Sequence, residues 1–204
     1  MKLIICLLVL ALSLARGAPA FNQRIEKGQQ LYGAKKYVEA ERVFQEVLKN
    51  EPNNARAAYF LGLTLLELKK FKEAESVFQR ANELTPSEDE VKIGLARAYM
   101  EQGQLEKADA ALNEAQEIDS NNADLYYYRG MLAAHRKDYT AAVDGFEKAV
   151  ALKPDYAYAH YHAGLAYNLL KRPDKMVGHF QEFLKLAPSA PESEKIRTVL
   201  RSVR

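Results

Sequence analysis

The sequence predicts an all-α protein that is built as a solenoid of repeated helix pairs. Two observations lead to this prediction. Residues 21–190 divide into five segments of 34 residues that align without an insertion, and apolar residues inside the segments recur at helical spacing. A unit of this length accommodates two helices and a turn. Stacking such units buries a continuous core that no single unit could bury alone.

Five columns of this alignment keep one kind of residue in nearly every segment. Position 8 is small, position 20 is small until the last segment, positions 24 and 27 are apolar, and position 32 is mostly proline. In column order they are Gly28, Gly62, Ala96, Gly130 and Gly164; Ala40, Ala74, Ala108, Ala142 and Met176; Phe44, Phe78, Leu112, Phe146 and Phe180; Val47, Ala81, Ala115, Ala149 and Phe183; and Pro52, Pro86, Ser120, Pro154 and Pro188. We expect the small residues to let the paired helices approach closely. The residue at position 24 then fills the space toward the next unit, and proline ends the second helix.

This pattern resembles the tetratricopeptide repeat family. The resemblance implies a right-handed α-solenoid of about five helix-turn-helix repeats. The chain departs from the family pattern at position 4, where only Tyr126 is a bulky aromatic, and at position 7, where Lys27 and Arg129 replace apolar residues. Met176 and Phe183 stand where small residues are usual. The predicted repeats are 21–54, 55–88, 89–122, 123–156 and 157–190.

Local signals mark the ends of the predicted helices. Ser87 and Glu90 form an S-x-x-E pattern that predicts a capping box at the start of the third repeat. Residues 191–204 predict a final capping helix, with Pro191 at its first position. Its apolar stripe would cover the open face of the last repeat and consists of Ile196, Val199, Leu200 and Val203.

Residues 1–20 are typical of an export signal peptide. Lys2 precedes an apolar stretch at 3–14, and Ala18-Pro19-Ala20 has the small-x-small pattern of a cleavage site. Ala15-Arg16-Gly17 is a second possible cleavage site. The apolar stretch is shorter than the roughly 17–25 residues of a spanning helix. We therefore expect an exported protein, periplasmic or secreted, and keep an uncleaved membrane anchor as the alternative.

Charge and cysteine content argue against nucleic-acid binding, attraction to an anionic membrane and disulfide bonds. Removing residues 1–20 takes away Lys2 and Arg16 and no acidic residue, which leaves 27 basic and 27 acidic side chains. Such a balance provides no global attraction to nucleic acid or to an anionic membrane. The single cysteine, Cys6, lies inside the apolar stretch, so the mature chain would have no disulfide.

The sequence contains no recognisable catalytic motif. It has no glycine-rich phosphate loop, no G-x-S-x-G and no H-E-x-x-H. His160 and His162 stand two residues apart, where helical side chains diverge by about 200°, so they are badly placed to share a metal ion. We expect no enzyme activity, no cofactor and no metal site.

The resemblance implies that the first helices of successive repeats line a concave groove. Carried over by phase, positions 2, 5, 9 and 12 of each repeat would face it. The candidate groove residues at these positions are Arg56, Tyr59, Leu63, Arg97, Met100, Tyr127, Met131, Tyr158, Tyr161, Leu165 and Asn168. Exposed tyrosine and methionine commonly form adaptable contact surfaces. The alternative is that these side chains only pack between neighbouring helices.

These residues predict a non-enzymatic scaffold or adaptor that binds another protein. Family members that bind free C-terminal carboxylates use a clamp of Lys, Asn and Arg, and the matching positions here are Ile25, Gln29, Phe60, Glu90 and Gly94. Because the clamp is missing, we expect an extended peptide or an amphipathic helix held by apolar contacts. Resemblance to exported bacterial repeat proteins suggests a role in cell-envelope or appendage assembly. The alternative is an N-terminally anchored tether that recruits partners at the bilayer.

Overall fold

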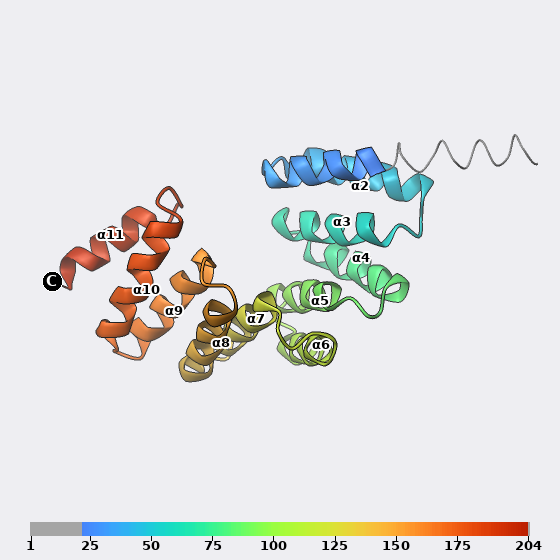
Figure 1. Ribbon diagram of the computed structural model, residues 1–204. Helices are drawn as coiled ribbons and strands as arrows, with labels where there is room; N and C mark the ends of the chain where they lie inside the picture. The colour runs from blue at the N-terminus through green and yellow to red at the C-terminus, as the bar shows by residue number, and fades with distance from the viewer. Residues whose placement is uncertain (1–21, 204) are drawn as a thin grey trace, which may run out of the picture. The chain divides into compact units, whose positions relative to one another are not determined.

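The computed structural model describes residues 22–203, so the predicted signal peptide lies outside the described residues. The described residues form helices joined by short turns, without a strand (Figure 1). Residues 22–33 are helical. The later helices are α2 (Tyr37–Asn50), α3 (Ala55–Glu67), α4 (Phe71–Leu84), α5 (Asp89–Glu101), α6 (Leu105–Ile118), α7 (Ala123–His135), α8 (Tyr139–Leu152), α9 (Ala157–Leu169), α10 (Pro173–Leu186) and α11 (Ser193–Ser202). The predicted all-α class is confirmed.

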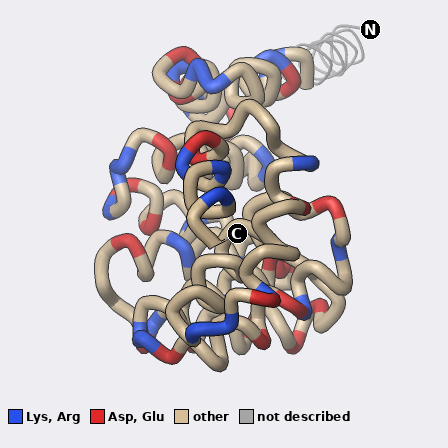
Figure 2. The backbone as a smooth tube through the Cα atoms, turned by 90° about the vertical axis from the view of Figure 1, so that its left-hand side faces the viewer, with Lys and Arg blue, Asp and Glu red and all other residues tan. Residues whose placement is uncertain are grey.

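The chain divides into two compact units, Met1–Gln102 and Gly103–Arg204, here called unit one and unit two. The division falls inside the third predicted repeat, so α5 belongs to unit one and α6 to unit two. Within unit one, α2, α3, α4 and α5 pack consecutively, and within unit two the helices α6 to α11 also follow one another (Figure 1). Basic and acidic positions are interspersed along the helices of both units (Figure 2). None of the helices over 22–203 combines the length and apolarity of a membrane span.

The phenylalanine column packs against glycine, as the repeat pattern predicts. Phe78 is fully buried in unit one. A Cβ atom on Gly62, in the same repeat, would lie 2.7 Å from the Phe78 ring, and one on Gly94, in the next repeat, would lie 2.5 Å from it. Both glycines therefore leave the space that the ring fills. In unit two, Phe146 occupies the same place beside Gly130.

The turn inside each helix pair uses a left-handed residue at position 15, a feature that was not predicted from the sequence. Four of these residues are lysines, although lysine carries a Cβ and glycine is the usual choice for a positive φ. The five residues and their φ angles are Lys35 (59°), Lys69 (59°), Gly103 (72°), Lys137 (60°) and Lys171 (56°). The backbone of the repeat thus requires a positive φ at this position, and the lysines there do not indicate it in the sequence.

The helix ends agree only in part with the capping signals. The Asn54 side chain accepts a hydrogen bond from the Ala57 amide at 2.9 Å and caps α3. The predicted capping box at Ser87 is wrong, because α5 starts at Asp89 and its N-cap is Glu88, without a side-chain cap. The chain turns into the helix one residue too late for Ser87 to reach the free amides.

The capping helix is present as α11. It begins at Ser193, so Pro191 lies two residues before it and not at its first position. Ile196 is buried within the cluster that contains Phe180 and Phe183, which covers the last repeat as expected. The predicted stripe ends early, because Val203 is 45% exposed.

Candidate functional site

Unit one contains a hollow between its first helices, α3 and α5. It has a volume of about 570 Å³ and brings together three predicted groove residues, Arg56, Tyr59 and Leu63. The other residues that line it are Gln29, Ala55, Phe60, Thr85, Glu88, Glu90 and Val91. Two predicted residues of unit one do not line it. Arg97 pairs with Glu67 at 2.6 Å, and Met100 is buried.

Aromatic packing shapes the wall of this hollow. The Tyr59 and Phe60 rings meet edge to face at 5.3 Å between centroids. Phe60 also stacks on Phe44 at 5.9 Å, and Tyr59 contacts Phe78 at 6.1 Å. The wall is therefore tied to the buried phenylalanine column and is held in place by the core.

Polar groups occur at the edge of the hollow. Arg56 donates from Nη2 to Gln29 Oε1 at 3.1 Å, which links α3 to the helix over residues 22–33. Glu88 and Glu90 lie near the start of α5. A ligand here would meet an aromatic and aliphatic wall with charges of both signs at its rim. An apolar lining with a few polar groups is common in the ligand sites of proteins.

In unit two, three of the predicted groove residues on α7 and α9, namely Tyr127, Tyr158 and Tyr161, belong to a continuous row of aromatic rings. We call this row the tyrosine face and define it as Tyr156, Tyr127, His162, Tyr161 and Tyr158. Neighbouring ring centroids along the row are 4.9, 5.7, 5.0 and 6.2 Å apart. Edge-to-face and offset stacking at these distances is favourable. Tyr156 and His162 were not among the residues predicted for this surface.

Two carboxylates hold the ends of the tyrosine face. Tyr156 donates from its hydroxyl to Asp124 at 2.6 Å, and Tyr158 donates to Glu192 at 3.3 Å. Burial and then the charge of Asp124 raise the pKa of Tyr156, while burial and then Glu192 raise the pKa of Tyr158. Both tyrosines therefore stay neutral hydrogen-bond donors at physiological pH.

The tyrosine face is also part of the packing of unit two. The Tyr127 ring lies 5.9 Å from Phe146, and the Tyr161 ring lies 5.1 Å from Phe183. Truncating either tyrosine to alanine would thus open a void beside the core, so the contact surface and the packing cannot be separated by that change. The remaining predicted residues in this unit are the half-buried Met131 and Leu165 and the exposed Asn168.

His162 is a neutral part of the tyrosine face. Its ring stacks on Phe146 at 5.7 Å with an interplanar angle of 26°. Burial lowers the pKa of His162 to about 4, with a smaller opposing effect of the Glu192 charge. At pH 7 this imidazole therefore adds no positive charge to the surface.

His160 and His162 point to different neighbours, as their spacing on one helix predicts. His160 lies 3.1 Å from His179 between the Nδ1 atoms. His179 in turn contacts Glu147 through Nε2 at 3.1 Å, and Tyr167 donates to the same carboxylate oxygen at 2.8 Å. Burial would raise the pKa of Glu147, but these hydrogen bonds outweigh burial and lower it. Across residues 22–203, no three or more His, Cys, Asp or Glu side chains are grouped to hold a metal ion.

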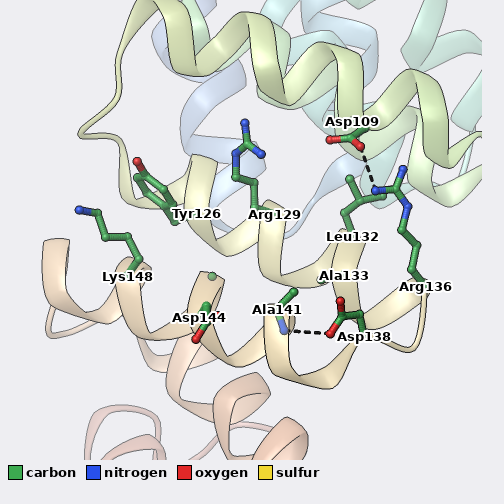
Figure 3. Close-up of a pocket in the computed structure, with 11 residues that line it drawn as sticks. Asp109, Tyr126, Arg129, Leu132, Ala133, Arg136, Asp138, Ala141, Asp144 and Lys148 are labelled. Carbon is green, nitrogen blue, oxygen red and sulfur yellow. Dashed lines mark hydrogen bonds and ion pairs between the residues drawn. The ribbon is translucent and has the colours of Figure 1, made fainter.

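A second hollow lies in unit two between α6, α7 and α8, and has a volume of about 370 Å³ (Figure 3). Its charged lining includes an ion pair from Arg136 to Asp109 at 2.9 Å. Arg129 donates to Asn113 at 2.7 Å. The other residues shown around it are Tyr126, Leu132, Ala133, Asp138, Ala141, Asp144 and Lys148. Because acidic and basic groups alternate around it, the hollow favours no single class of charged ligand.

Comparison with known proteins agrees with this architecture. The family model of the cytochrome c-type biogenesis protein H TPR domain matches residues 19–159, and a tetratricopeptide repeat model matches residues 144–191. No curated protein matches the chain at a significant level.

Similar solved structures are repeat proteins. A thermophilic TPR protein of Thermus thermophilus is 24% identical, with a TM-score of 0.79 over 89% of this chain and 97% of that chain. MamA of Desulfovibrio magneticus RS-1 is 20% identical, with a TM-score of 0.61 over 84% and 97%. YrrB, a TPR protein with an unusual peptide-binding site, is 19% identical, with a TM-score of 0.56 over 86% and 90%. At these identities the likeness concerns the fold. The family-model match covers well over half of the chain, and the chain therefore belongs to the tetratricopeptide repeat family, with the TPR domain of cytochrome c-type biogenesis protein H as its matching family model.

Proposed function

We propose that this protein is a non-enzymatic adaptor of the cell envelope that binds a segment of another protein on its first-helix surfaces. The observation that carries this proposal is the hollow of unit one, where Tyr59, Phe60 and Leu63 form an apolar wall beside polar rim groups. Its volume of about 570 Å³ lies within the range of ligand sites. The wall is held by core packing, so ordering it on binding would cost little entropy.

The occupant that fits this hollow best is a protein segment with apolar side chains. An extended peptide or one face of an amphipathic helix could place such side chains against Tyr59 and Leu63 while its polar groups reach Arg56 or Glu90. Tetratricopeptide repeats are interaction scaffolds as a family, and YrrB, which shares the fold, has a peptide-binding site. Both facts support this class of ligand.

The proposed location outside the cytoplasm has two supports. Residues 1–20 have the pattern of an export signal. The matching family model is the TPR domain of a protein named for cytochrome c-type biogenesis, which agrees with a role at the cell envelope. In this proposal the bound segment belongs to a protein that is being assembled in the cell envelope or in an appendage.

Site-specific photo-crosslinking tests the proposed binding surface. The photoreactive residue p-benzoylphenylalanine replaces Leu63 in the full chain, in the cells that naturally make it. The same residue replaces Val38 as a matched control, because Val38 lies in unit one, is 54% exposed and does not line the hollow. We expect a discrete protein adduct at Leu63 and none at Val38. Equal adducts at both positions, or none at Leu63, would reject the hollow as the binding surface.

A membrane-anchored tether is the second candidate, and the observation that favours it is Arg16 beside a short apolar stretch. In that form the N-terminal segment stays attached and the repeats recruit partners at the bilayer. The intact mass of the natural protein separates the two candidates. A mature chain that starts near Ala18 or Phe21 excludes the anchor, whereas a chain that retains residues 1–20 supports it.

A further inference from the structure

We propose that the tyrosine face of unit two selects a basic segment of the partner protein, one that presents lysine or arginine side chains. This inference rests on the proposed function and adds the charge of the partner to it. Its basis is the combination of the five aromatic rings with the carboxylates Asp124 and Glu192, which accept hydrogen bonds from Tyr156 and Tyr158.

The two carboxylates are not neutralised by a basic side chain. Some acidic residues elsewhere in unit two form ion pairs, such as Asp109 with Arg136 and Glu194 with Arg197. Over residues 22–203, no lysine or arginine lies within ion-pair distance of Asp124 or Glu192. The side-chain donors that reach them are tyrosine hydroxyls, so both charges remain available to a cation from outside.

The aromatic rings add a second attraction for cations. The faces of tyrosine rings are electron-rich, and a lysine or arginine placed over such a face is attracted to it, more strongly when water is excluded. One cation of the chain already uses this attraction, since Lys153 Nζ lies 5.2 Å from the centroid of Tyr156 at one end of the row. At the other end, Tyr158 is 39% exposed and lies beside Glu192. A guanidinium or ammonium there would meet a ring and a carboxylate together.

The hollow of unit one carries charges of both signs. At position 2 of the repeat it presents Arg56 and Glu90, whereas the charged side chain at this position in unit two is Asp124. Arg56 would repel a basic side chain that entered the hollow, so a basic segment is better suited to the tyrosine face.

Fluorescence anisotropy with matched peptides tests this charge preference. The probes are three fluorescein-labelled peptides of about 12 residues with the same leucines and phenylalanine, which differ only in carrying Lys, Gln or Glu at the same positions. The protein is the full chain after residue 20, at about 0.15 M salt. We expect the Lys peptide to bind at least about tenfold more tightly than the Glu peptide, with the Gln peptide between them.

Isosteric variants connect the preference to the two carboxylates. Asp124→Asn with Glu192→Gln keeps hydrogen-bond acceptors for the tyrosines and removes both charges. We expect it to weaken binding of the Lys peptide about five- to tenfold and to leave binding of the Gln peptide nearly unchanged. The control is Glu117→Gln, an exposed acid on α6 outside the tyrosine face, which should change neither.

The outcomes separate this inference from the proposed function. Equal binding of the Lys, Gln and Glu peptides overturns the charge preference and leaves segment binding standing. Loss of Lys-peptide binding in the Glu117→Gln control to the same extent as in the double variant also overturns it. Binding of none of the three peptides contradicts both proposals for this unit.

Discussion

The Nδ1 atoms of His160 and His179 lie 3.1 Å apart in unit two, where α9 packs against α10. The other ring nitrogen of each histidine meets an acceptor. His160 Nε2 is 3.0 Å from the Pro154 carbonyl oxygen, and His179 Nε2 is 3.1 Å from the Glu147 carboxylate. Because those oxygens only accept, both Nε2 atoms donate, and the Nδ1 contact is a hydrogen bond when one proton is shared between the rings.

Replacing His179 by alanine should destabilise unit two. The change removes the contacts to His160 and Glu147 and the stacking on Tyr167, whose centroid is 5.4 Å away. Since Glu147 is partly exposed, we expect a loss of only about 2 kcal/mol in the free energy of unfolding. Urea unfolding followed by circular dichroism measures it. His135→Ala, at the exposed end of α7, is the control and should change stability by less than about 0.5 kcal/mol. A loss in His179→Ala as small as the one expected for the control would mean that the contacts of His179 do not stabilise unit two.

Gly145→Ala should destabilise the protein, and Gly178→Ala should stabilise it. A Cβ on Gly145 would lie 2.6 Å from the Gly130 amide nitrogen, so two helix backbones would have to separate. We expect a loss of about 2 kcal/mol, or roughly 4–8 °C in Tm by calorimetry. Gly178 lies inside α10 and has no atom within 4 Å of an added Cβ. Its replacement should gain about 0.5–1 kcal/mol through helix propensity. A stable Gly145→Ala protein would show that α7 and α8 can move apart at little cost.

The left-handed turn residues should respond to substitution according to their φ angle. Lys137→Gly removes the Cβ strain of a residue at φ 60°. Glycine also increases the conformational entropy of the unfolded chain, which offsets part of this benefit. We therefore expect a net gain of about 0.5 kcal/mol in the free energy of unfolding. Gly103→Ala introduces that strain at φ 72°. It should cost about 1 kcal/mol. Urea midpoints compare the two. A loss on Lys137→Gly would mean that the lysine side chain contributes more than its backbone strain costs.

His162 should make the folded state sensitive to acid. Its pKa of about 4 in the folded state lies below the ordinary value of 6.5. Between these values the unfolded chain binds a proton that the folded chain does not, so stability falls as pH falls from about 6.5 to 4. The total loss is on the order of 3 kcal/mol. His162→Phe should remove this loss, because phenylalanine cannot be protonated. A phenylalanine fits at this position of the repeat, since Phe60, the equivalent residue of the second repeat, stacks on Phe44.

Urea midpoints at about pH 7 and about pH 4.5 test the acid sensitivity. We expect the difference between the two pH values to shrink in His162→Phe and to persist in His135→Gln, which leaves the tyrosine face intact. The same pH dependence in His162→Phe and in the unmodified chain would assign the acid sensitivity to other groups.

The helical class, the repeat length and much of the core could be predicted from the order of residues alone. These features follow from periodicity, because every repeat must bury the same stripe of residues. The alignment columns that contain Gly62 and Phe78 therefore keep one kind of residue in most repeats, although neighbouring positions vary. The hollow of unit one was also partly predictable, since Arg56, Tyr59 and Leu63 share one helix face by spacing alone.

The contacts across repeats, in contrast, become visible only once the helices are packed. Tyr156 belongs to the tyrosine face and Glu192 accepts a hydrogen bond at its end, yet both lie outside the phase positions that identified Tyr127 and Tyr161. The left-handed lysines are likewise visible only in the structure, as is the start of α5 at Asp89, which leaves Ser87 without a capping role. Such contacts depend on the angle and spacing between packed helices. These quantities arise from many residues together, so no single motif in the sequence encodes them.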